Sequence, residues 1–263
     1  MIVAVIVTYN RKELLGENIQ MLLEQTRSID RICIVDNCST DGTPKYLQKN
    51  GWKNNNQFVY IRTESNIGGA GGFYTGTKAA FELGADWILL MDDDGKMADK
   101  FMLECLMSVA EQLYESNIAD RKLFINALVQ QGEMLSFKMG IKYTVQQALD
   151  ASRSGILEGE ANPFNGTLIS RELVEKIGFP NKEFFIKGDE VDYKQRTLDA
   201  GGYIATVVNA RYLHPRPKTQ EKTVLGIKVP FIVEAAWKEY YTARNFTYMY
   251  KCQKHYKAIV FEI

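Results

Sequence analysis

Residues 2–10 read IVAVIVTYN, an apolar run rich in β-branched side chains that is followed at once by polar residues. A short run of this kind is typical of a strand in a parallel sheet with both faces covered. The run is too short to span a membrane, and it has neither the basic start nor the small-residue cleavage site of a signal peptide. The sequence therefore predicts that the chain opens with a buried parallel strand.

The same pattern repeats through the first hundred residues. We expect strands at residues 2–8, 31–35, 58–62 and 87–91, separated by helices at residues 12–25, 41–50 and 69–83. This alternation predicts right-handed crossovers and an α/β fold with a mostly parallel, Rossmann-like sheet flanked by helices. Ligands of such sheets bind beyond the carboxyl ends of the strands. Polar side chains gather at that edge, namely Thr8, Tyr9, Asn10, Asp36, Asn37, Glu64, Ser65, Asn66, Asp92, Asp93 and Asp94.

The second half is less regular. A hairpin is expected at residues 123–138 and a polar, mobile loop with a short helical fragment at residues 140–162. Further along we expect strands at 164–169 and 203–208, helices at 171–177 and 190–200, a proline-rich loop at 215–230 and a long aromatic helix at 235–251. The chain stops inside the apolar run 257–263, KAIVFEI, which leaves open that it is part of a longer protein.

Composition excludes several classes of protein. Of 263 residues, 46% are hydrophobic, and the formal net charge is zero, which argues against disorder and against a nucleic-acid binder. The four cysteines form no CxxC pair, so no disulfide framework or zinc site is indicated. With no run of about 18 apolar residues, no membrane-spanning helix is expected. We expect a cytoplasmic protein.

Three aspartates follow the strand predicted at 87–91. Buried unpaired charges are costly, so this cluster is not a feature of the core. Asp92 and Asp94 suit a hard divalent cation such as Mg²⁺ or Mn²⁺, which also binds phosphate oxygens. The alternative is an acidic cap on the next helix, but a cap needs only one aspartate.

Two further strand ends carry chemistry. Residues 64–73, ESNIGGAGGF, form a glycine-rich turn that opens a helix, where free N–H groups favour phosphate, although a turn without a ligand is the alternative. It is not a P-loop, because no GK[ST] follows. Asp36 could accept a hydrogen bond from a base or ribose, whereas Asp41 is expected to serve a turn.

Asp189, Glu190 and Asp192 stand at the start of a predicted helix. Acids in a first turn interact favourably with the helix dipole, but one near a cation could also act as a general base. His214 is one of two histidines. A lone histidine is more often structural, although the aspartate cluster favours a third ligand.

The last fifty residues are basic in a neutral chain. Ten Lys or Arg and three acids lie between Arg211 and Lys257, interleaved with aromatic side chains. This pattern fits either a solvated helix that packs its aromatic face on the domain or contact with an anionic lipid surface or lipid diphosphate.

Taken in order, these motifs resemble the inverting glycosyltransferases of family 2. The resemblance runs over residues 2–214 and rests on VTYNR, VDNCSTDGT, SNIGGAGG, LLMDDDG, FNGTLISRELVEKIGFP, FFIKGDEVDYKQR and a late histidine, with WKEYYTARN at 237–245 typical of one branch. Within the family it is most similar to bacterial galactofuranosyltransferases, with rhamnosyltransferases close by. Gly188 stands where the former carry a tryptophan, and Glu190 stands where they carry a second aspartate.

The resemblance implies a GT-A fold over residues 1–214, with a nucleotide-binding half at 1–95, an acceptor-binding half at 96–214 and a helical extension at 215–263. It implies Glu190 as the base with Asp189 beside it, and Mn²⁺ or Mg²⁺ held by Asp92, Asp94 and His214. Arg244 would meet an acceptor phosphate. The nucleotide sugar would lie against Thr8, Tyr9, Asn10, Asp36, Asn66, Gly68, Gly69, Gly72, Asp92 and Asp93.

The implied activity is transfer of a sugar, galactofuranose favoured, from a UDP-sugar to a hydroxyl of a growing bacterial cell-surface glycan. The acceptor would be a glycan or a lipid-linked glycan, with peripheral contact at the inner face of the cell membrane. The alternatives are a rhamnosyltransferase using dTDP-rhamnose, a nucleotidyltransferase and an inactive sugar-binding module. A nucleotidyltransferase would carry its glycine-rich signature after the first strand, where this chain has VTYNRKE.

Overall fold

The computed structural model describes residues 1–224 and 227–252. Its first part follows the predicted alternation closely. The strands are β1 (Ile2–Thr8), β2 (Arg31–Asp36), β3 (Phe58–Arg62) and β4 (Trp87–Asp92), and the helices between them are α1 (Lys12–Leu23), α2 (Thr43–Lys49) and α3 (Gly68–Glu82), with a short 3-10 turn at Trp52–Asn54.

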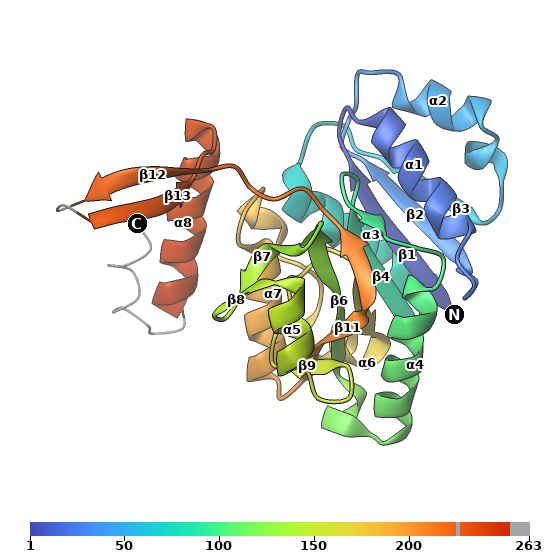
Figure 1. Cartoon of the computed structure of the whole chain (residues 1–263). Helices are drawn as coiled ribbons and strands as arrows, with labels where there is room; N and C mark the ends of the chain where they lie inside the picture. The colour runs from blue at the N-terminus through green and yellow to red at the C-terminus, as the bar shows by residue number, and fades with distance from the viewer. Residues whose placement is uncertain (225–226, 253–263) are drawn as a thin grey trace.

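The strands belong to one eleven-stranded sheet with the main order β3-β2-β1-β4-β10-β6-β11-β5. The pairs β3–β2, β2–β1 and β1–β4 run parallel, and so do β6 (Leu123–Gln131) and β11 (Tyr203–Leu213). Between these groups lies β10 (Thr167–Ser170), antiparallel to both β4 and β6. The carboxyl ends of β1, β2, β4 and β11 therefore open toward one edge (Figure 1).

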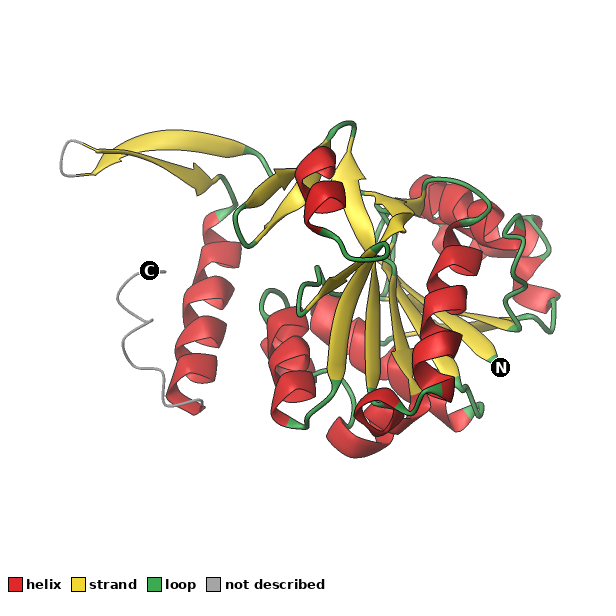
Figure 2. Cartoon of the chain, turned by 60° about the horizontal axis from the view of Figure 1, so that its bottom comes forward, coloured by secondary structure: helices red, strands yellow, loops and turns green. Residues whose placement is uncertain are grey.

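Both faces of the sheet are covered, and β1 shows why its sequence is apolar throughout. Alternate side chains of a strand point to opposite faces. Ile2, Ala4 and Ile6 belong to one buried cluster, whereas Val3 and Val5 belong to another. Helices lie on both sides of the sheet (Figure 2). A strand with two buried faces has no polar position, as the run at 2–7 predicts.

The second half completes the domain with smaller elements. It contains β5 (Lys96–Met97), α4 (Met102–Glu115), a 3-10 turn at Ile118–Arg121, β7 (Met134–Met139), β8 (Lys142–Thr144), α5 (Val145–Ala151), β9 (Ile156–Glu158), α6 (Arg171–Ile177), a 3-10 turn at Lys182–Phe184 and α7 (Asp189–Asp199). The hairpin of β6 and β7 is confirmed. The loop expected at 140–162 is wrong in part, because β8 and β9 add edge pairings there on either side of α5.

The loop expected at 215–230 is wrong. Residues Thr219–Val224 form β12 and Ile227–Ile232 form β13, an antiparallel pair that extends away from the main sheet. Its prolines suggested a loop, but two of them precede β12, and Pro230 lies in a two-stranded ribbon, where an edge position tolerates the missing donor. The long aromatic helix is confirmed as α8 (Ala236–Cys252).

Within the described residues, no helix combines the length and the apolar character needed to cross a membrane. The chain end at 257–263 lies outside the described residues.

Candidate active site

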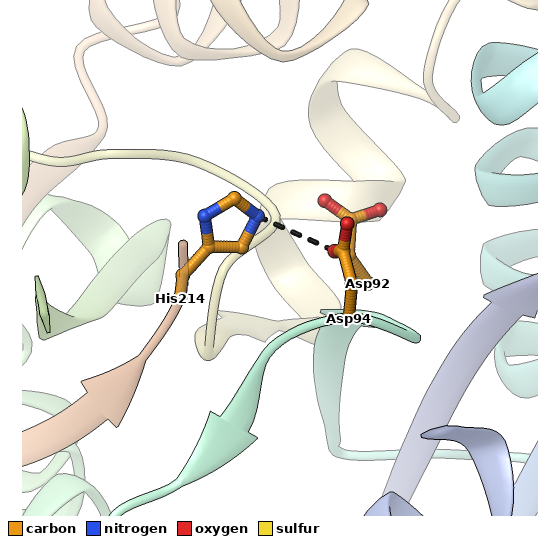
Figure 3. Close-up of side chains that lie close together, drawn as sticks. All are labelled: Asp92, Asp94 and His214. Atoms are coloured by element: carbon orange, nitrogen blue, oxygen red, sulfur yellow. Dashed lines mark ion pairs between the residues drawn. The ribbon is translucent and has the colours of Figure 1, made fainter. Parts of the chain in front are cut away.

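Two distant segments meet at the edge where the predicted ligands gather. Asp92 ends β4, Asp94 lies two residues later, and His214 directly follows β11. One potential ligand atom of each side chain lies within 4.8 Å of the others, and His214 Nε2 is 3.4 Å from Asp94 Oδ1 (Figure 3). The structure thus brings together the three side chains that the sequence proposed as metal ligands.

The histidine ring is oriented for ligation. His214 Nδ1 lies 2.7 Å from the carbonyl oxygen of Pro215, which can only accept, so we assign the ring proton to Nδ1. In the neutral ring this places the Nε2 lone pair on the side of the two aspartates, the arrangement usual for metal-bound histidines. Burial would lower the pKa of His214, but its hydrogen bond to Asp94 and the charges of Asp94 and Asp92 raise it.

The charge balance of the cluster fits a cation. Burial, together with the charge of Asp94, raises the pKa of Asp92 to about 7. Burial also acts on Asp94, but His214 and Arg11 outweigh it and lower the pKa of that carboxyl. Two carboxylates and one imidazole form a donor set that suits Mn²⁺ and also accepts Mg²⁺. The residues present therefore fit a divalent ion, whose charge would offset the burial and the repulsion that raise the pKa of Asp92.

The middle aspartate has a different environment. Asp93 is buried, accepts a hydrogen bond from Thr8 Oγ1 at 2.8 Å, and pairs with Arg11 Nη1 at 2.9 Å. The same Arg11 nitrogen is 2.8 Å from Asp94 Oδ2. Sequence reasoning missed Arg11, although a cation directly after VTYN, at the edge that also holds three carboxylates, could have indicated it. Thr8 is almost fully buried, so its hydroxyl serves Asp93 in this structure.

The residues proposed for the nucleoside lie at the ends of β1 and β2. Tyr9 is exposed, whereas Asn10 has a left-handed φ of 56° and its Oδ1 accepts from the N–H of Thr40 at 2.6 Å. Asp36 is completely buried, and its carboxylate accepts from the N–H of Ser39 and the hydroxyl of Tyr60. Direct contact between Asp36 and a nucleoside stays a prediction, and it would require neighbouring groups to move because this carboxylate is completely buried.

The glycine-rich turn is built for close packing. A Cβ on Gly68, whose φ is +74°, would lie 1.9 Å from the carbonyl oxygen of Phe185, and one on Gly72 would lie 2.3 Å from Val7. Gly69, by contrast, has nothing within 4 Å of its Cβ position. The side chain of Asn66 accepts from the N–H of Gly68 at 2.9 Å. Two of the glycines thus serve contacts within the protein, and their proposed proximity to a diphosphate stays a prediction.

Two acids at the start of α7 lie next to each other in space as well as in sequence. Asp189 is 5% exposed, while Glu190 is half-buried. Burial, then the charge of Glu190 and a hydrogen bond with it, raise the pKa of Asp189 well above its ordinary value. The charge of Glu190 also contributes to the raised pKa of Asp92, so α7 faces the metal-ligand candidates. Asp192 instead pairs with Arg196 at 2.8 Å, as expected of an acid on a helix face.

Arg244 was expected at an acceptor phosphate, but the structure gives it other partners. Its Nη2 donates to the carbonyl oxygens of Glu183 and Phe184, and its Nε donates to Asn245 Oδ1. These bonds use its Nε and Nη2, whereas a guanidinium has two further N–H donors on Nη1, so contact between Arg244 and an acceptor phosphate stays a prediction.

Comparison with known proteins agrees with this geometry. The model of the family described as Glycosyl transferase family 2 matches residues 3–177. The chain belongs to this family. It is 32% identical over 252 residues to Galactofuranosyltransferase GlfT1 of Mycolicibacterium smegmatis, which covers 94% of this chain and 82% of that protein. The chain is therefore a glycosyltransferase.

Solved structures share its fold at low sequence identity. GalNAc-T7 with UDP, GalNAc and Mn²⁺ gives a TM-score of 0.62 at 14% identity, covering 86% of this chain and 44% of that one. Staphylococcus aureus TarS 1–349 in complex with UDP gives 0.55 at 17% identity, covering 82% and 60%. This chain thus spans less than two thirds of either structure. Both are GT-A glycosyltransferases, and the GT-A fold expected from the sequence is confirmed.

Proposed function

We propose that this glycosyltransferase moves a sugar, galactofuranose favoured, from a UDP-sugar to a hydroxyl of a growing bacterial cell-surface glycan, with inversion at the anomeric carbon. The observation that carries the proposal is the cluster of Asp92, Asp94 and His214 facing the acids of α7. The 32% sequence identity with GlfT1, over 94% of this chain, favours galactofuranose as the sugar.

Asp92, Asp94 and His214 would hold Mn²⁺ or Mg²⁺. A divalent ion bound there would neutralise charge on the diphosphate as it leaves. The protein's own part is to keep the imidazole aimed through its Nδ1 contact with Pro215 and to fix the aspartate loop. Asn18 supports that loop, because its side-chain amide donates to the carbonyl oxygens of Asp92 and Gly95.

Glu190 would act as the general base. In a single displacement, the acceptor oxygen loses its proton to Glu190 and bonds to the anomeric carbon, while the bond from that carbon to the diphosphate breaks. The raised pKa of Asp189 supports this division of roles, because a protonated Asp189 can donate to Glu190 and leave it as the acceptor. Asp189 would then orient the base without taking the proton.

The deciding experiment measures UDP release and sugar transfer by the purified chain with UDP-galactofuranose and Mn²⁺, against the same reaction with EDTA. Activity with dTDP-rhamnose alone would instead establish the rhamnosyl alternative. Replacing Asp94 with Asn should abolish metal-dependent binding of UDP while leaving the fold intact. If that variant still bound UDP with the same dependence on metal as the wild type, the assigned metal site would be contradicted.

We also propose that the enzyme works at the cytoplasmic face of the membrane on a lipid-linked acceptor. The excess of basic residues between Arg211 and Lys257 supports this, since each Lys or Arg near an anionic surface contributes about 1 kcal/mol. Exposed aromatic side chains on α8, Trp237 and Tyr240 among them, support it as well.

A further inference from the structure

The segment that leads into α7 is fastened to α8 by two adjacent side chains. Asn245, which is 1% exposed, directs its Nδ2 at the carbonyl oxygens of Phe184, Ile186 and Lys187, at 3.0, 2.9 and 2.6 Å. Arg244 Nη2 lies 2.7 Å from the carbonyl oxygen of Glu183 and 2.9 Å from that of Phe184. Four of the five carbonyls at 183–187 are therefore held by α8.

The same two side chains hold each other. Arg244 Nε donates to Asn245 Oδ1 at 2.8 Å, so the amide cannot turn over without placing its NH₂ group against the guanidinium. Its two N–H bonds are shared among three carbonyls. We call Arg244 and Asn245 the clamp. Because every bond from the clamp to residues 183–187 goes to a backbone carbonyl oxygen, the clamp fixes the path of that backbone without using the side chains of the segment.

The segment needs such fixing because its backbone is strained. Phe185 and Lys187 have φ values of 64° and 67°, in the left-handed region that side chains disfavour. Conformations of this kind persist only where the surroundings over-determine them. The ring of Phe185 also stacks on Tyr241 of α8, with centroids 4.9 Å apart.

What the segment positions is the pair of acids. Residue 188 is the glycine that precedes α7, and Asp189 and Glu190 are the first two residues of that helix. On its other side, the segment touches the glycine-rich start of α3, where the N–H of Ala70 donates to the carbonyl oxygen of Phe185 at 3.1 Å. A shift of residues 184–187 would therefore move Glu190 relative to both α3 and the aspartates of β4.

We infer that Arg244 and Asn245 are positioning residues that set the place of Glu190 from α8, which lies outside the residues matched by the family model. The inference rests on the proposed role of Glu190 as base. It gives α8 a part in catalysis that neither its charge nor its aromatic face suggested. Displacement of a catalytic group by about 1 Å costs on the order of 100-fold in rate, so a loosened clamp should lower turnover more than donor binding.

The test compares Asn245→Asp with Thr247→Asp. The first change turns a donor into an anion that faces three carbonyl oxygens, and the second puts the same charge on an exposed position of the same helix. We expect Asn245→Asp to lower kcat by roughly 10- to 100-fold, with the donor KM and the Kd for UDP with Mn²⁺ within twofold of wild type. A kcat equal to that of Thr247→Asp, or a parallel loss of UDP binding, would overturn the inference.

Hydrogen exchange keeps this test separate from the proposed function. In Asn245→Asp, amides at 68–72 and 184–190 should exchange faster, while those of β1 and β4 keep their protection. If wild type transfers no sugar, the proposed function fails, and unchanged exchange at 184–190 would independently refute the clamp. Should Asn245→Asp not fold, Arg244→Gln removes two carbonyl bonds without burying a charge. The same kcat loss and the same exchange pattern, in weaker form, are expected of it.

Discussion

Mn²⁺ and protons should compete for the same cluster, which makes metal affinity depend on pH in a direction that the structure fixes. In the metal-free protein the pKa of Asp92 is about 7. About a tenth of these carboxyls are ionised at pH 6 and about nine-tenths at pH 8. Because the ion binds the carboxylate, its apparent Kd should tighten roughly tenfold between those two pH values.

The protonation of the other two proposed ligands, Asp94 and His214, decides whether the tenfold change in apparent Kd is a lower or an upper limit. The pKa of Asp94 is lowered, so this carboxylate is ionised throughout the range and adds no slope. The pKa of His214 is raised, so a second proton must leave before Nε2 can bind the ion, which steepens the dependence in the same direction. We therefore expect a change of tenfold or more.

Isothermal titration of the EDTA-treated protein with MnCl₂ at pH 6 and pH 8 measures this change. The variant Asp92→Asn should bind the ion more weakly at pH 8 and lose most of the tenfold slope, leaving what His214 contributes. Equal affinity at the two pH values, or tighter binding at pH 6, would refute the reasoning. The direction of the pKa shift of Asp92 also determines how stability depends on pH. An acid whose pKa is raised by folding destabilises the metal-free protein as pH rises from about 4 to 7. Mn²⁺ should reverse this loss of stability.

Three further outcomes are expected. Glu190→Gln should keep UDP binding and lower turnover by roughly 10²–10⁴-fold. The control Asp192→Asn should stay near wild-type turnover in the same assay. Equal losses in the two variants would show that Glu190 is not distinguished from an acid on the helix face. Gly68→Ala should cost at least about 1–2 kcal/mol for its left-handed φ alone, measured by urea unfolding against Gly69→Ala as the unstrained control. Co-sedimentation with anionic vesicles should occur at low salt and weaken at high salt, because salt screens charges and the Debye length is about 10 Å at 0.1 M ionic strength. Binding that does not change with salt would count against a basic contact surface at 211–257.

The parts of the fold that follow a simple period were open to prediction from the sequence. Strand β1 is apolar at every position from Ile2 to Val7 because both of its faces are buried, and this local fact is visible in the sequence. Asp92 and Asp94 could be predicted as site residues because they follow a buried strand, and the carboxyl end of such a strand lies at the ligand-binding edge of the sheet. The hairpin of β12 and β13 was harder to predict. The prolines in and before it indicated a loop, and its two strands pair with each other and not with the main sheet.

The contacts that sequence reasoning missed are all distant along the chain. Arg11 reaches aspartates more than eighty residues away, and Asn245 reaches carbonyls about sixty residues away. Such partners are chosen by the path of the backbone, and no spacing or periodicity in the chain encodes them. For Arg244 the residue type suggested a phosphate, since guanidinium groups bind phosphate well, but nothing in the sequence indicated its bonds to the carbonyl oxygens of Glu183 and Phe184.

The chain divides the proposed reaction between two of its parts in a way that bears on specificity. The residues proposed for the donor lie in the part matched by the family model, with His214 as the exception that arrives on β11. The proposed base and the side chains that hold it lie beyond residue 177, on α7 and α8. Replacing side chains on α8 should therefore change acceptor use and turnover before it changes donor affinity. The reverse pattern, donor discrimination altered by changes on α8, would mean that this helix lines the nucleotide-sugar site and that the two parts of the chain do not divide the reaction in this way.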